Sequence, residues 1–134
     1  LAYVGRLFAS RAFYKLVPDQ GHTVLTAGFQ SGSSYATAAR ASDGSSIIAY
    51  IPTGRSVTIN LLQVSGTSAR AWWFNPRTAV ATLINTYSTS GTTTFTSPDA
   101  SDWVLVVDNA SLNLPAPGAI TQALAAPANF RIVP

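Results

Sequence analysis

The sequence predicts an all-β protein, an antiparallel two-sheet β-sandwich of about eight strands with a short N-terminal helix. Three observations support this fold class: short runs rich in β-branched and aromatic residues, turn sequences between the runs, and alternation of apolar and polar residues over 56–62. Turn signals at intervals of about 8–12 residues are typical of sandwiches and barrels. The short connections between the runs favour antiparallel pairing.

Eight runs have the composition of strands, and we expect them at residues 22–30, 34–42, 45–52, 56–62, 69–76, 79–87, 92–98 and 102–109. Asp43-Gly44 separates the second run from the third, and this pair is a strong hairpin signal. Apolar residues alternate with polar ones in the fourth run, which indicates one buried face. The last run is apolar on both faces, so we expect a central, covered strand in which Trp103 is buried.

The composition divides the chain into three parts. Residues 1–21 carry apolar side chains at helical spacing up to Pro18, which predicts a short helix and a connecting segment from an upstream domain. Residues 22–109 hold the predicted strands of the sandwich. Residues 110–134 are rich in Ala and Pro, which predicts a linker and the start of a following module.

Charge and cysteine content exclude several classes of function. The net charge is +3, but the eight Lys and Arg residues are scattered along the 134 positions and form no run. A nucleic-acid interface needs clustered bases, so we expect no nucleic-acid partner. The chain has no Cys, which excludes disulfides and thiolate metal sites. No apolar run approaches the roughly 18 residues of a membrane span, so we expect no membrane partner.

The residues that usually perform catalysis are scarce. The sequence has no Glu, five Asp and a single histidine, His22, which we interpret as a surface or capping residue. Glycoside hydrolysis usually needs two facing carboxylates, whereas most Asp residues here fall in predicted turns. Asp99 and Asp102 are close in sequence but lack the ladder of ligands of a calcium loop. We therefore expect no catalysis, no cofactor and no metal site.

Three consecutive aromatic residues, Trp72, Trp73 and Phe74, form the most informative stretch. Side chains alternate between the two faces of a strand, so Trp73 opposes Trp72 and Phe74. One face belongs to the core, and the other meets solvent, a ligand or a neighbouring domain. Core packing is the commoner role of each Trp, whereas a displayed ring would stack on a sugar or dock a partner.

Several motifs resemble one known family. They are Ala71–Thr78 (AWWFNPRT), Phe95–Pro98 (FTSP) and Asp102–Val107 (DWVLVV), with Lys15–Asp19, Ala41–Gly44 and Ala49–Gly54 upstream. In this order and spacing they resemble the putative collagen-binding domain of a collagenase, over about residues 13–109. The sequence departs from that family at Asn75, where Asp is common, and at Ala79, where Gly is expected after Thr78.

The resemblance implies a non-catalytic C-terminal accessory module of a secreted carbohydrate-active enzyme. In that family the domain usually follows a (β/α) barrel similar to glycoside hydrolases, so residues 1–21 would come from the end of that barrel. The expected partners are a polysaccharide or glycan and the upstream catalytic barrel of the same chain, in an extracellular setting. Two alternatives are a structural domain that buttresses the barrel and a module that binds collagen or another protein.

The resemblance also suggests a ligand site. The first Trp of the family motif packs inward, which implies that Trp73 faces outward as a stacking platform. Trp72 stays in the set because strand alternation alone does not decide which face is the core. Polar groups beside an aromatic surface are the usual composition of such a site. The candidate ligand-binding residues are Trp73, Arg77, Tyr50, Tyr87 and Trp72.

Overall fold

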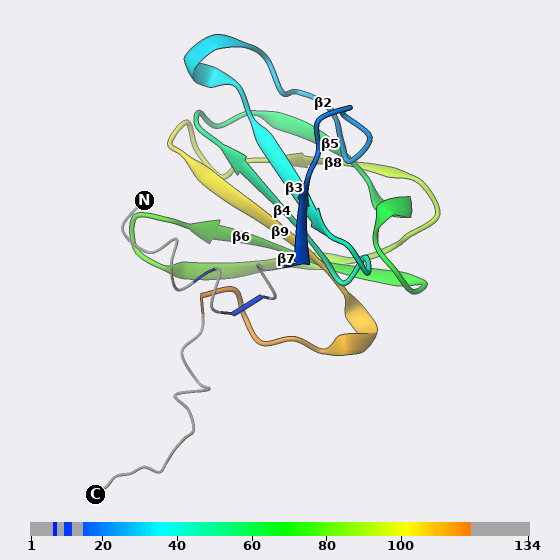
Figure 1. Cartoon of the computed structure of the whole chain (residues 1–134). Helices are drawn as coiled ribbons and strands as arrows, with labels where there is room; N and C mark the ends of the chain where they lie inside the picture. The colour runs from blue at the N-terminus through cyan, green and yellow to red at the C-terminus, as the bar shows by residue number, and fades with distance from the viewer. Residues whose placement is uncertain (1–6, 8–9, 12–14, 119–134) are drawn as a thin grey trace, which may run out of the picture.

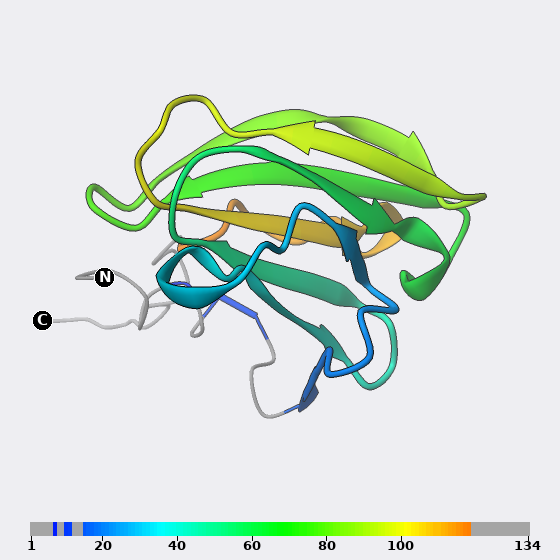
Figure 2. The same cartoon turned by 90° about the horizontal axis from the view of Figure 1, so that it is seen from above.

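The computed structural model describes residues 7, 10–11 and 15–118, and these form two facing antiparallel sheets (Figure 1, Figure 2). The prediction of an all-β, two-sheet antiparallel fold is confirmed, with nine strands in this part of the chain instead of eight. The expected N-terminal helix falls largely on residues outside those described, and so does the second half of the expected linker. No helix among the described residues is long and apolar enough to cross a membrane.

The larger sheet has six strands in the order β1-β3-β4-β9-β6-β7, and the smaller sheet has three in the order β2-β5-β8. The strands are β1 Leu16–Pro18, β2 Leu25–Ala27, β3 Thr37–Ala41, β4 Ser46–Ile51, β5 Ser56–Asn60, β6 Ser68–Asn75, β7 Val80–Ser88, β8 Thr92–Thr96 and β9 Trp103–Asn109. Two short 3-10 helices, η2 Gly32–Ser34 and η3 Leu61–Gln63, lie between strands, and a third, η4 Ala110–Leu112, follows β9.

The additional strand is β1, which lies inside the segment that the sequence places before the sandwich. Leu16 pairs with Ala41 and Pro18 with Ala39, so β1 forms one edge of the large sheet. Three residues ending at a proline give almost no strand signal, because proline cannot donate to a sheet ladder. Its edge position explains why that proline is tolerated.

The main core lies between the two sheets. On β5, Val57 and Ile59 are buried whereas Ser56, Thr58 and Asn60 are not, which confirms the predicted alternation. Other large members of this core come from both sheets and from η3: Leu25, Ile47, Ile51, Leu61, Trp73, Phe95, Trp103, Leu105 and Val107. Each such side chain contributes about 1.5–3 kcal/mol when it leaves water.

The outer face of the large sheet carries a second apolar cluster. It consists of Leu7, Ile48, Phe74, Val104 and Val106. All seven residues of β9 are buried, because Trp103, Leu105 and Val107 point to the main core while Val104 and Val106 point outward. The prediction of a central strand covered on both faces is therefore confirmed.

The segment after β9 packs on this outer face, at variance with the linker that its composition predicts. Pro117 and Gly118 are buried, and a Cβ at Gly118 would lie 2.4 Å from the Phe74 ring. Only a glycine fits so close to the ring. Residues 110–118 are thus part of the folded domain, and the Pro residues that suggested a linker shape a packed segment instead.

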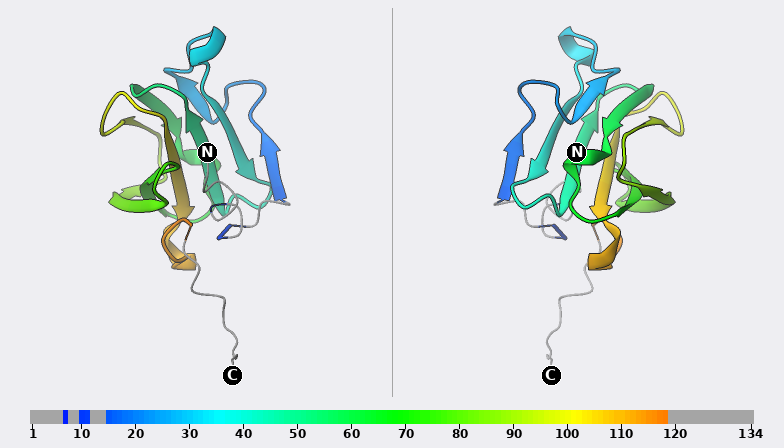
Figure 3. Two further views of the ribbon diagram at one scale, coloured as in Figure 1. Left: turned by 90° about the vertical axis from the view of Figure 1, so that its left-hand side faces the viewer. Right: turned by 90° about the vertical axis from the view of Figure 1, so that its right-hand side faces the viewer.

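A buried ion pair joins the two terminal segments to the large sheet. Arg11 donates from Nε to Asp108 Oδ1 at 2.9 Å and from Nη2 to Asp108 Oδ2 at 2.7 Å. Asp108 also accepts from Ser46 Oγ at 2.7 Å, and Arg11 donates to the carbonyl of Pro115 at 2.9 Å. The described parts of both terminal segments therefore lie side by side against the sheet (Figure 3).

The turn between β6 and β7 contains a strained residue. Ala79 has φ of 64°, the left-handed conformation that glycine adopts without a steric penalty. This is the position where the family motif carries Gly. The departure in sequence therefore leaves the turn intact at the cost of local backbone strain.

Candidate functional site

The two tryptophans of β6 point to opposite faces, but in the reverse of the expected sense. Trp73 is only 6% exposed and packs in the main core, edge-on to Trp103 at a centroid distance of 6.3 Å. Trp72 is half-buried on the outer face, against the second cluster. Arg70 shares the face of Trp72, and charged residues rarely occupy a closed core. The position of Trp72 two residues from Arg70 on the same strand would therefore have identified its face as the outer one.

Tyr87 is also a packing residue. It lies near the end of β7, opposite Ala69, and its ring meets Phe95 of β8 edge-on at 5.3 Å. Arg77 lies beyond the other end of β7, in the turn from β6. Trp73 and Tyr87 thus do not form the outward platform that the sequence suggested.

Arg77 and Tyr50 do meet, at what we call the Trp103 corner, formed by Tyr50, Arg77, Asp99, Asp102 and Trp103. Arg77 Nε lies 3.0 Å from Asp102 Oδ1, and Tyr50 donates its hydroxyl to Asp102 Oδ2 at 3.3 Å. The Arg77 guanidinium covers the Trp103 ring at 5.1 Å from its centroid. Burial, together with the charge of Asp102, raises the pKa of Tyr50 above its usual value.

Asp99 completes this corner. Its Oδ1 accepts from the Trp103 indole N–H at 2.8 Å and from the Ser101 amide at 2.8 Å. These hydrogen bonds, the indole bond first, lower the pKa of Asp99. Trp103 itself is 8% exposed, which confirms its predicted burial. Arg77 and Asp102 pair with each other and Asp99 accepts from the indole, so the arrangement is a structural clamp.

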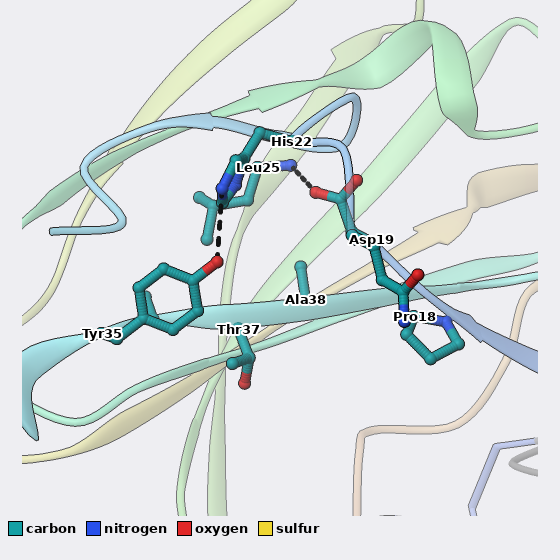
Figure 4. A pocket seen from close by; sticks show the side chains of 9 residues that line it. Pro18, Asp19, His22, Leu25, Tyr35, Thr37 and Ala38 are labelled. Atoms are coloured by element: carbon teal, nitrogen blue, oxygen red, sulfur yellow. Dashed lines mark hydrogen bonds between the residues drawn. The ribbon is translucent and has the colours of Figure 1, made fainter. Parts of the chain in front are cut away.

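A different corner holds an open hollow, which we call the Tyr35 corner and define by Asp19, His22, Phe29 and Tyr35. The hollow has a volume of about 180 Å³ and lies between the loop after β1 and the start of β3 (Figure 4). Leu25, Ala36 and Ala38 line it with apolar surface, and Gln20 and Thr37 add polar groups. Concave apolar surface with a few polar groups is the usual composition of a ligand site.

The loop at this corner is fixed by one carboxylate. Asp19 accepts from the backbone amides of Thr23 at 2.9 Å, Val24 at 3.2 Å and Leu25 at 2.9 Å. It also accepts from the hydroxyl of Thr23 at 3.2 Å. These bonds hold His22 at φ of 54° and direct its ring toward Tyr35 (Figure 4).

Three rings pack together at the Tyr35 corner. His22 stacks on Phe29 with a centroid distance of 3.8 Å and an interplanar angle of 12°. Tyr35 meets both rings edge-on, and its hydroxyl lies 3.2 Å from His22 Nε2. Tyr35 is nevertheless 38% exposed. It is therefore a rigidly held aromatic surface that stays open to solvent.

Comparison with known proteins places this chain in a family. Residues 17–108 match the family described as the putative collagen-binding domain of a collagenase. The chain belongs to this family. The match starts within β1 and ends at Asp108, so it spans both sheets but not Arg11. No curated protein matches the chain.

Two solved structures resemble this family member closely in fold. One is named a glycoside hydrolase, with 25% identity, a TM-score of 0.73, and coverage of 81% of this chain and 24% of that chain. The other is a glycoside hydrolase family 5 protein from Bacteroides vulgatus ATCC 8482, with 26% identity, a TM-score of 0.73, and coverage of 81% and 23%. The domain thus spans about a quarter of each hydrolase chain, and it is an accessory domain linked to glycoside hydrolase structures.

The Tyr35 corner of this collagen-binding-family domain was missed by the sequence reasoning. His22 was interpreted as a surface or capping residue, whereas its ring is half-buried between Phe29 and Tyr35. His22 lies between β1 and β2, and Phe29 and Tyr35 lie between β2 and β3, so the three rings share no strand or helix and no periodic pattern links them. Among the described residues there is no cluster of three or more His, Asp, Glu or Cys side chains that could hold a metal ion.

Proposed function

We propose that this domain is a non-catalytic accessory domain of a secreted glycoside hydrolase and that its outer sheet face packs against the catalytic domain of the same chain. One observation carries the proposal: the outer face is a second apolar core in which Leu7, from the segment leading into the domain, is buried. An ordinary sandwich presents polar residues on its outer faces. The outer face here is built to be covered.

Part of that face remains open at β6 and β7. Leu83, the cross-strand partner of Trp72, is 52% exposed. The Trp72 indole N–H is buried and has no acceptor within the part of the chain that the structure describes. A buried donor without an acceptor costs about 1–3 kcal/mol. A docked domain would cover Leu83 and supply the acceptor.

The matched hydrolases support a catalytic domain as the occupant. In those chains the region equivalent to this domain accounts for about a quarter of the length, which leaves the rest for other domains. The described residues of the leading segment, Leu7 and Arg11, already lie on the outer face. A domain that precedes this segment would therefore lie close to that face.

The use of the carboxylates supports a non-catalytic role. Asp19 and Asp99 accept from loop amides, and Asp43 pairs with Lys15. Asp102 and Asp108 pair with arginines. Each of the five Asp residues of the sequence is therefore engaged in holding the fold.

The docking proposal can be tested in a chain that contains this domain together with its hydrolase catalytic domain. Leu83→Glu places a charge in the interface, and we expect calorimetry to show the two domains unfolding separately and the catalytic domain melting earlier. Leu62→Glu is the matched control, because Leu62 is 65% exposed on η3, next to the small sheet. Identical unfolding of wild type and Leu83→Glu would contradict the docking proposal.

Polysaccharide binding is a second candidate function, and it is supported by the exposed, rigidly held Tyr35 beside an open hollow. This site lies at the β1 edge of the molecule, away from Trp72 and Leu83, so both functions can coexist. Affinity electrophoresis against neutral plant polysaccharides tests it, with collagen as the comparison. We expect retention by a polysaccharide and none by collagen. Free migration in every gel would contradict this second function.

A further inference from the structure

We propose that the hollow at the Tyr35 corner is a subsite that holds one uncharged pyranose unit of a polysaccharide against the face of Tyr35. This inference rests on the second candidate function, polysaccharide binding. It replaces the dispersed set of Trp73, Arg77 and Tyr87 with residues that lie around one cavity.

The platform is already in position. The Tyr35 hydroxyl is held at 3.2 Å from His22 Nε2, and the ring edges pack on Phe29 and His22. An aromatic side chain that is fixed before binding loses little conformational entropy when a ligand stacks on it. The Tyr35 ring is 38% exposed, so part of it stays free for such stacking.

The backbone supports the same assignment. His22, one of the three rings, has φ of 54°, and Gln30, which follows Phe29, has φ of 57°. Non-glycine residues in the left-handed region are costly and concentrate at binding sites, where surrounding bonds hold them. At His22 the Asp19 carboxylate provides such bonds through the backbone amides of the three residues that follow.

The size of the hollow indicates how much of a ligand it holds. Its volume of about 180 Å³ is below the roughly 300–1,000 Å³ of pockets that enclose whole small-molecule ligands. One six-membered ring fits this scale better than a longer segment. The apolar floor at Leu25, Ala36 and Ala38 suits the C–H face of a sugar, and Gln20 and Thr37 lie where ring hydroxyls would need partners.

Charge indicates that the ligand is neutral. Asp19 is the one formally charged side chain that lines this hollow, and its two oxygens already accept four hydrogen bonds from the loop. No lysine or arginine lines the hollow to receive an acidic sugar. A neutral hydroxyl-rich ligand is therefore favoured over a uronic acid or a phosphate.

A second hollow extends the site along the edge of the large sheet. It has a volume of about 290 Å³ and shares Pro18, Thr37 and Ala38 with the first. Its far side is lined by Ile48 and Tyr50. The two hollows adjoin at Pro18, Thr37 and Ala38, so the next unit of a chain would lie over Thr37, on the β3–β4 part of the outer face, and the docked domain would cover the β6–β7 part. Affinity should therefore rise from mono- to oligosaccharides.

A proline-rich helix such as collagen fits this surface less well. Recognition of such helices uses grooves lined by several aromatic rings. Six large apolar residues of the described chain are exposed, and Tyr35 is the one aromatic residue among them. One platform beside one ring-sized hollow favours a sugar.

Titration calorimetry with neutral hexasaccharides of glucose, xylose, mannose and galactose tests the subsite. We expect Tyr35→Ala to weaken binding of the preferred hexasaccharide about tenfold or more, through loss of ring stacking. Tyr35→Phe should retain most of the affinity because the ring stays. Leu112→Ala is the matched control, since Leu112 is exposed on η4, away from the hollow. A collagen-like peptide serves as the competing ligand.

Each outcome decides a separate point. Equal binding by wild type and folded Tyr35→Ala overturns the subsite but leaves polysaccharide binding standing. Absence of binding to all four hexasaccharides contradicts polysaccharide binding itself, and binding of the collagen-like peptide alone overturns both. Should Tyr35→Ala fail to fold, amide NMR shifts of the wild type decide: changes centred on Tyr35 and Thr37 support the subsite, and changes elsewhere overturn it.

Discussion

The Trp103 corner and the Tyr35 corner are built alike around a loop aspartate and an aromatic ring, but one is closed and the other is open. In each, an aspartate at a loop accepts backbone amides: Asp99 from Ser101, and Asp19 from three residues. At the Trp103 corner, Arg77 then closes over the aromatic ring. At the Tyr35 corner the ring packs on His22 and Phe29 but stays 38% exposed, and a hollow opens beside it.

The difference shows how a conspicuous sequence motif can mislead. The Trp-Trp-Phe run and its Arg77 attracted the functional assignment, yet the structure uses Trp73 and Phe74 for the two cores. The residues around the open hollow are a lone histidine and a tyrosine in a connection. Binding sites on sandwiches are carried by connections on a rigid scaffold, where sequence patterns are weakest.

The largest expected effect is at the closed corner. Trp103→Ala removes a buried ring that contacts Trp73 and Arg77, and we expect a loss of about 3–5 kcal/mol in the free energy of unfolding. Urea denaturation measures it. Stability close to wild type would show that this corner is not the clamp we describe.

A smaller effect is expected at the open corner. Asp19→Ala leaves three backbone amides without their acceptor, and we expect a loss of about 1–2 kcal/mol, as for other capping side chains. Sugar affinity should fall as well, because His22 loses its fixed conformation. Thermal unfolding and titration calorimetry on the same variant separate the two effects. Unchanged affinity would mean that the loop does not shape the hollow.

Relief of strain beside the closed corner should raise stability. Ala79→Gly removes the steric penalty of φ at 64°, partly offset by the greater freedom of glycine in the unfolded chain. We expect a gain of about 0.5–1 kcal/mol, measured by denaturation. Ala81→Gly on β7 is the control and should lower stability. A loss in both variants would contradict the strain.

The smallest effect concerns acid. The pKa of Asp99 is lowered in the folded state, so its contribution to stability is present above the ordinary Asp pKa of about 3.9 and is lost as the pH falls through the lower folded value. Below about pH 4 the melting temperature of wild type should therefore fall more steeply than that of Asp99→Asn. Parallel curves would show that the bond to the Trp103 indole does not depend on ionisation.

The alternation of apolar and polar residues along single strands accounts for what the sequence predicted. The same alternation does not say which of the two faces of a strand is the core. Alternation identified the buried face of β5, and apolar residues at every position identified β9 as central. Alternation on β6 established that Trp72 and Trp73 oppose each other, but it assigns neither face to the core. The charged Arg70, on the same face as Trp72, is the signal on this strand that marks the outer face.

The Tyr35 corner brings together residues that are close in sequence but follow no repeating pattern. His22, Phe29 and Tyr35 meet because β2 and β3 belong to different sheets and their connection folds back at Gln30. The three-residue strand β1, which supplies Pro18 to both hollows, gives no usable periodicity. The fold class could therefore be predicted from sequence, whereas the candidate site could not.

The ion pair of Arg11 and Asp108 limits how this domain can be moved between enzymes. The family match ends at Asp108 but begins after Arg11, so a transplant cut at those limits would carry a buried carboxylate without its cation. Loss of one partner of a buried pair costs about 3–5 kcal/mol, a large share of the stability of a small domain. Recombination that preserves the fold must therefore take the preceding segment along, and with it part of the junction to the catalytic domain that we propose as its neighbour.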